Sequence, residues 1–204
     1  MQVELVTYTP ESDKICAAAA LCCHSNNSAC YIYNDLTNEK KADILRKTIK
    51  MGHYSVLEHA NFTFSISDVS RALTHQLVRH RIASYSQQSQ RYVKLNEATF
   101  VTPPSIQSNS EALDKYKKAM ESIWDSYNHL IEMGIPKEDA RFILPNATTT
   151  SITVTMNARE LRHFFNLRCS KSAQWEIRAL AWKMLEEVKG VAPIIFEGAG
   201  PRSD

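Results

Sequence analysis

The sequence predicts a mixed α/β (α+β) fold: a compact single domain with a small sheet flanked by helices. Three short segments alternate apolar and polar residues as strands do, and the segments between them carry apolar residues at helical spacing. The 204 residues are enough for one domain with a real core, and no internal repeat or domain boundary divides them. We therefore expect one domain over residues 1–204, ending in a loose tail at 197–204.

The first half of the chain is expected to alternate helices and strands. We expect strands at 3–8 and 61–66, and helices at 11–23, 38–51 and 70–80. In the second strand Phe62, Phe64 and Ile66 are predicted to face inward, because alternate side chains share a face. The helix from residue 38 is expected to end near Gly52, a residue suited to a helix C-cap.

The sequence of the second half of the chain predicts a long helix, one strand and further helices. We expect a loop at 102–110, helices at 113–131, 136–144, 158–168 and 173–188, and a strand at 148–156. Ser108 and Glu111 have the spacing of a capping box at the start of the long helix, and Gly134 is expected to end it. Its apolar stripe predicts core or subunit contact: Leu113, Tyr116, Met120, Ile123, Trp124, Tyr127, Leu130 and Ile131.

Charge and hydropathy exclude several classes of protein. The net charge of +2 gives no overall field for nucleic acid, so any basic character must be local. No apolar run reaches the length of a membrane span, and the first four residues are not typical of a signal peptide. We therefore expect a cytoplasmic protein without a membrane or nucleic-acid partner.

The five cysteines do not indicate a metal or redox site. No two of them have the C-x-x-C spacing of zinc ligands or redox pairs. Free cysteine is usually buried, so we expect reduced, buried thiols and no bound metal.

The segment from Arg79 to Arg91 contains three arginines, a histidine, three serines and three glutamines. A planar guanidinium gives a phosphate group two parallel hydrogen bonds. A solvated basic surface is the alternative, but lysine would serve it equally well and the segment contains none. We expect a site for a ligand with several oxyanions and a planar polar ring.

The helix expected at 158–168 carries a second signal. One face places an arginine below three apolar residues: Leu161, Phe164, Phe165 and Arg168. A half-buried arginine needs an anion or acceptor, supplied either by a ligand or by one of three glutamates, Glu58, Glu160 or Glu176. The opposite face is also polar, with Arg159, Arg162, His163 and Asn166. Both sides of this helix are therefore candidates to line a site.

Glycine-rich phosphate loops are absent from the sequence. The chain has five glycines and neither a G-x-G-x-x-G nor a Walker pattern, so side chains must hold any bound phosphate. The segment 52–59 offers two histidines and a glutamate to a cofactor, but their spacing does not match H-E-x-x-H.

Two other functions stay open at this point. Single-stranded nucleic acid could stack on Tyr85 and Tyr92 among the arginines, although the low net charge argues against it. A helical scaffold could assemble through the stripe at 111–131, and it would tolerate the loss of Arg79.

The motifs resemble those of one family. Arg79-His80-Arg81, followed after seven residues by Ser89, is similar to the R-H-R-x7-S signature of the flavin-dependent thymidylate synthases. Further segments resemble the family in its order along the chain: Gly52-His53, Glu58-His59, 140–145, 157–159, 166–168 and 173–176.

The resemblance implies a methyltransferase that makes dTMP from dUMP without a cysteine nucleophile. Methylenetetrahydrofolate would give the one-carbon unit, and FAD reduced by NADPH would give the hydride. It also implies a homotetramer whose active sites are shared between subunits, with a compact mixed α/β fold.

By position, the resemblance implies two sets of contacts. The flavin would contact His53, Ser55, Glu58, Arg79, His80, Arg81, Gln87, Asn157, Arg159 and His163. The nucleotide dUMP would contact Gln76, Arg79, Gln87, Gln88, Ser89, Gln90, Arg91, Arg141 and Arg168. Gln87 stands where the family often has glutamate, so hydrogen bonds are kept there and a charge is lost. Arg168 is expected to be catalytic, since it could stabilise negative charge on the uracil ring as the N3 proton leaves.

Overall fold

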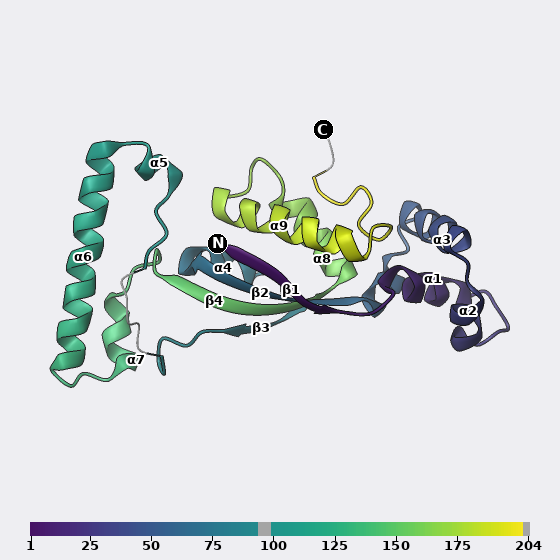
Figure 1. The fold of residues 1–204 in the computed structure, drawn as a ribbon, viewed down its shortest axis with the longest axis horizontal. Helices are drawn as coiled ribbons and strands as arrows, with labels where there is room; N and C mark the ends of the chain where they lie inside the picture. The colour runs from purple at the N-terminus through teal and green to yellow at the C-terminus, as the bar shows by residue number, and fades with distance from the viewer. Residues whose placement is uncertain (94–98, 202–204) are drawn as a thin grey trace.

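A four-stranded antiparallel sheet runs through the middle of the molecule (Figure 1). The computed structural model describes residues 1–93 and 99–201. In sheet order the strands are β1 (Gln2–Tyr8), β2 (Asn61–Ser70), β4 (Thr149–Asn157) and β3 (Ala83–Gln87). The mixed α/β fold expected from the sequence is therefore confirmed.

One face of the sheet forms the core. Phe62, Phe64 and Ile66 are fully buried, as predicted, and pair in register with Met156, Val154 and Ile152 of β4. On the opposite face polar side chains alternate with them, as in the bond of 2.9 Å between the hydroxyls of Thr63 and Thr155. This alternation is typical of an antiparallel sheet that is packed on one side only.

Helices cover the core face and extend from both ends of the sheet. Those on the core face are α4 (Arg71–Leu77), α8 (Ala158–Arg168) and α9 (Trp175–Val191) (Figure 1). Those at one end are α1 (Ser12–Cys22), α2 (Ala29–Asp35), α3 (Asn38–Lys50) and the 3-10 helix η1 (Tyr54–His59). Those at the other end are α5 (Pro104–Gln107), α6 (Ser110–Glu132), α7 (Lys137–Ala140) and the 3-10 helix η2 (Arg141–Ile143).

The predicted helix ends are confirmed at two glycines and corrected at one cap. Gly52 and Gly134 follow α3 and α6 with φ of 78° and 84°, a left-handed conformation that glycine adopts without strain. The start of α6 was predicted one residue too early. Asn109, not Ser108, is the N-cap, and its side chain accepts a hydrogen bond from the backbone N–H of Ala112.

Three short elements were not expected. Strand β3 lies inside the arginine-rich segment, where Ala83 and Tyr85 pack against the core and the alternating Ser84 and Ser86 are exposed. The many polar residues hid this alternation. Helix α2 follows the predicted break, where Ser28 caps it, and α5 lies within the predicted loop. The helix predicted at 136–144 is two separate turns, α7 and η2.

The tail predicted at 197–204 is packed in its first part. Glu197 pairs with Arg46 at 2.7 Å, and Ala199 packs against the core. Residues 202–204 lie outside the described residues.

Candidate functional site

A hollow of about 580 Å³ opens beside α8. Four of its lining residues are the polar face of α8 that the sequence singled out: Arg159, Arg162, His163 and Asn166. The other lining residues are Glu160 of α8 and its N-cap Asn157, Tyr54 and Glu58 of η1, Ile82, and residues 198–200. Its volume lies within the range of small-molecule sites, about 300–1,000 Å³. The hollow is therefore the first candidate for a cofactor site.

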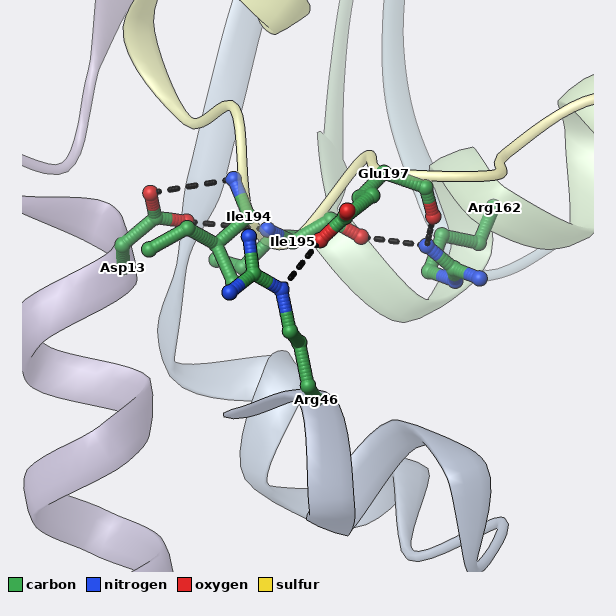
Figure 2. A network of polar contacts seen from close by, with 6 residues as sticks. All are labelled: Asp13, Arg46, Arg162, Ile194, Ile195 and Glu197. Atoms are coloured by element: carbon green, nitrogen blue, oxygen red, sulfur yellow. Dashed lines mark hydrogen bonds and ion pairs between the residues drawn. The ribbon is translucent and has the colours of Figure 1, made fainter. Parts of the chain in front are cut away.

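Residues 198–200 of the C-terminal segment line this hollow. Figure 2 shows the polar contacts that hold the segment just before them. The carboxylate of Asp13 accepts hydrogen bonds from the backbone N–H groups of Ile194 and Ile195, at 3.2 and 3.0 Å. Arg162 donates to the carbonyl oxygens of Ile195 and Glu197. The guanidinium of Arg162 is thus committed to the backbone, and it fixes the segment that leads to Gly198.

The rim of the hollow carries an ion pair that a ligand can open. Arg159 Nη1 lies 2.5 Å from Glu58 Oε1, and both side chains are about half exposed. Such exposed pairs stabilise a fold by about 1 kcal/mol or less. An anionic ligand can therefore replace Glu58 at Arg159 at a small energetic cost.

The acceptor that Arg168 requires is a histidine. Arg168 Nε donates to Nε2 of His80 at 3.1 Å, and His80 Nδ1 lies 3.2 Å from Oε1 of Glu160. Of the three glutamates considered from the sequence, Glu58 pairs with Arg159 and Glu176 accepts from the N–H and hydroxyl of Ser70. Only Glu160 reaches Arg168, and it does so through the imidazole.

Several predicted nucleotide contacts lie together where β3 ends. Arg71 Nη1 lies 3.5 Å from the carbonyl oxygen of Gln88, and the Oγ of Ser89 accepts from the N–H of Arg91. Arg91 Nε pairs with a carboxylate oxygen of Glu138 at 2.5 Å. These contacts join three of the predicted residues, Gln88, Ser89 and Arg91, to Arg71, which the sequence did not single out.

Two guanidinium groups approach each other in this same group. Burial, and then repulsion by the charge of Arg141, lower the pKa of Arg71. Arg141 Nε donates to the backbone carbonyl of Glu138 at 3.1 Å. Among the described residues neither Arg71 nor Arg141 has a carboxylate in salt-bridge range, and the buried Nε2 of Gln90 has no hydrogen-bond partner. Cations without a carboxylate partner and a buried donor without an acceptor each favour an anion such as phosphate.

Most of the other residues predicted to contact flavin or dUMP lie outside the hollow of this chain. Side chains of His53, Ser55, Arg79 and Arg81 are exposed and do not line it, and Gln76 is half-buried on α4. Gln87 Nε2 donates to the hydroxyls of two threonines, Thr74 at 3.0 Å and Thr150 at 3.3 Å. An amide suits these two acceptors, so the residue that replaces the family's frequent glutamate has a structural use here.

The sequence missed residues that only the tertiary arrangement brings to the site. Tyr54 and Ile82 line the hollow from the segments next to the predicted histidines and arginines. Glu160 carried a detectable signal, since Glu160, Phe164 and Arg168 follow the i, i+4, i+8 spacing of one helix face. No local pattern in the sequence marked Arg71, because it interacts with Arg141, which lies 70 residues further along the chain.

The cysteines are reduced, but the expectation that all are buried was wrong. Cys16 and Cys169 are buried, whereas Cys22, Cys23 and Cys30 are exposed on α1, α2 and their connection. Burial raises the pKa of the Cys16 thiol to about 12 and that of Cys169 to about 11, so neither is an activated nucleophile.

We expect iodoacetamide to modify three of the five cysteines of the native protein, because two are buried. Intact-mass spectrometry after brief treatment checks the count, and unfolding in denaturant should release all five. Native modification of Cys16 or Cys169 would show that the core opens on the timescale of the reaction.

No helix of the described residues is long and apolar enough to cross a membrane. Over the same residues, no cluster of three or more histidine, cysteine, aspartate or glutamate side chains could hold a metal ion.

The chain is similar to known proteins over nearly its whole length. Residues 4–194 match the family model described as thymidylate synthase complementing protein. The flavin-dependent thymidylate synthase of Geobacter sulfurreducens is 51% identical, covering 98% of this chain and 88% of that protein. The enzyme of the same name from Saccharolobus solfataricus is 48% identical, covering 98% of this chain and 77% of its own length.

A solved structure has the same fold. It is the crystal structure of a UMP/dUMP methylase, PolB, from Streptomyces cacaoi, bound with 5-Br dUMP. The two chains are 25% identical with a TM-score of 0.85, and the match covers 96% of this chain and 93% of the other.

Proposed function

This chain belongs to the family of flavin-dependent thymidylate synthases, and we propose that it methylates dUMP to dTMP at a site built around α8. The family resemblance gives the co-substrates: methylenetetrahydrofolate for the carbon and NADPH for the reducing equivalents. The observation that carries the proposal is the position of α8. One face of this helix lines the hollow, and its last residue holds a guanidinium against an imidazole.

We assign the hollow to FAD. Of the residues expected to contact flavin, Glu58, Asn157, Arg159 and His163 line it. The half-exposed pair of Arg159 with Glu58 offers a cation to the pyrophosphate, and the His163 ring offers a nitrogen to the isoalloxazine. His80 is 5% exposed and does not itself line the hollow; its ring contacts Glu160 and His163, which do. We therefore assign His80 a role through Arg168 rather than a direct flavin contact.

We assign the group at the end of β3 to the nucleotide. Arg71 and Arg141 would bind the phosphate, and the amide of Gln90 would find there the acceptor that it lacks in the chain alone. Ser89 accepts a backbone hydrogen bond from Arg91, which supports a contact role rather than a nucleophilic one.

The chemistry at uracil must proceed without a cysteine nucleophile. FAD held in the hollow would, once reduced, supply the hydride that the methyl group requires. Because an arginine side chain is always charged in proteins, Arg168 would present a positive charge to the ring. That charge stabilises the anion formed when uracil loses its N3 proton and so makes the carbon that is methylated more nucleophilic.

We also propose the homotetramer with shared sites that the family resemblance implies. Support comes from α6, which stands apart from the sheet (Figure 1) and buries only Tyr127 of its apolar stripe. Nearby, Phe142 is 82% exposed. A second copy would cover these side chains, as symmetric interfaces do. A cytoplasmic location, as expected from the sequence, is part of the same proposal.

NADPH oxidation by the purified protein, followed by assay for dTMP, tests the function. We expect a yellow protein that forms dTMP only when dUMP, methylenetetrahydrofolate and NADPH are all present. UMP should be run in parallel, because the Streptomyces neighbour is named for both nucleotides. A colourless protein that binds oligonucleotides with a steep salt dependence would support the nucleic-acid alternative instead.

A further inference from the structure

The side chains of Glu160, His80 and Arg168 form a series of hydrogen bonds along α8. Glu160 lies in the first turn of the helix and Arg168 in its last. Eight residues of helix separate them by about 12 Å. His80, which follows α4, bridges this distance with one ring nitrogen bonded to each partner, at 3.2 Å and 3.1 Å.

The protonation state of the bridge follows from its partners. Burial, and then the charges of Arg168 and His163, lower the pKa of His80 to about 4, so its ring is neutral at physiological pH. Arginine can only donate, so Nε2 of His80 must accept from Arg168. The single ring proton therefore sits on Nδ1 and is donated to Glu160, which fixes one tautomer of His80.

The ring is held in place by its surroundings. It packs edge-on against Phe164, with 4.9 Å between centroids, and Phe164 lies on α8 between Glu160 and Arg168. The Tyr85 hydroxyl lies 2.7 Å from the backbone carbonyl of His80 and anchors that residue to β3. His80 therefore has one orientation that serves both partners.

The carboxylate end of the chain is fixed as firmly. Glu160 is 6% exposed, and its backbone N–H donates to the side chain of the N-cap residue Asn157. A negative charge in the first turn of a helix is favoured by the helix dipole. The hydrogen bond to Glu160 thus fixes the position and the tautomer of the imidazole. The imidazole in turn fixes the acceptor of the Arg168 Nε–H.

We propose that Glu160 is a positioning residue for nucleotide binding, which acts through His80 to hold the Nε atom of Arg168. This inference rests on the proposed function, in which Arg168 contacts uracil. A guanidinium bonded at Nε loses rotation about its terminal torsions while its two terminal nitrogens stay available to a ligand. Without Glu160 the Nδ1–H of His80 would have no acceptor, and the ring could turn and release Arg168.

A double-mutant cycle on FAD-saturated protein, read as the dissociation constant of dUMP, tests this link. Glu160→Leu should weaken dUMP binding by about fivefold or more, a coupling of ordinary size for linked side chains. In the Arg168→Ala background the same substitution should have no further effect. Glu160→Gln keeps an oxygen that accepts from Nδ1 and should bind dUMP within about threefold of the original protein.

Two further variants separate the link from other effects. His80→Phe breaks the bridge without entering the hollow and should match Glu160→Leu; it carries the test if Glu160→Leu loses flavin. Leu180→Ala removes a fully buried side chain of α9 and should lower the melting temperature without weakening dUMP binding.

Unchanged dUMP affinity in Glu160→Leu and His80→Phe overturns the proposal, as does an equal loss with and without Arg168. If the unaltered protein fails to bind dUMP, the proposed function falls with it. If that protein binds dUMP and both Glu160→Leu and His80→Phe bind it as well as the original does, the function stands and the positioning role alone fails.

Discussion

Replacing Arg168 with alanine should abolish dTMP formation while the protein keeps its flavin. The guanidinium lies at the end of the apolar face of α8 and bonds His80, outside the group that lines the hollow. Loss of one donor that stabilises a developing anion lowers turnover by about a hundredfold or more. Flavin absorbance at saturation measures FAD, and single-turnover formation of dTMP measures the chemistry.

Arg178→Ala is the matched control for Arg168→Ala. The Arg178 guanidinium also bonds a neutral acceptor, the backbone carbonyl of Lys171 at 2.9 Å, but lies on α9 outside the proposed site. We expect near-normal turnover from this variant. Normal turnover by Arg168→Ala would remove Arg168 from the mechanism, and a loss of flavin in that variant would move it to the FAD site.

Replacing Arg71 with alanine should weaken dUMP binding by about tenfold to a hundredfold, the range for a lost hydrogen bond to a charged group. Arg71 and Arg141 lie close together without carboxylate partners among the described residues, so a bound phosphate would relieve their repulsion. The same logic gives Arg141→Ala a similar loss. Titration calorimetry on FAD-saturated protein measures the dissociation constant.

Deoxyuridine is the matched ligand control for the Arg71 prediction. It has the same base and sugar but no phosphate, so its weaker binding should be equal in the original protein and in Arg71→Ala. If Arg71→Ala loses affinity for both ligands alike, Arg71 supports the shape of the site rather than the phosphate. If it binds dUMP normally, the phosphate lies elsewhere.

Local patterns in the sequence were enough for the main elements and for part of the site. Alternation identified three of the four strands, and helical spacing identified both faces of α8 correctly. The fourth strand, β3, escaped because its pairing with β4 supplies the stabilisation that its polar residues lack. An edge strand of this kind is defined by its neighbour, which single-residue patterns do not show.

The sequence by itself determined the fold class, the family and the types of residue at the site, because periodicity and motif spacing are local properties of the chain. Only the tertiary structure decided which side chains meet. In the folded chain the acceptor for Arg168 is His80 rather than a glutamate, and the charge of Arg141 acts on Arg71. These contacts depend on how α4, β3 and α8 pack together, and burial of the core face sets that packing.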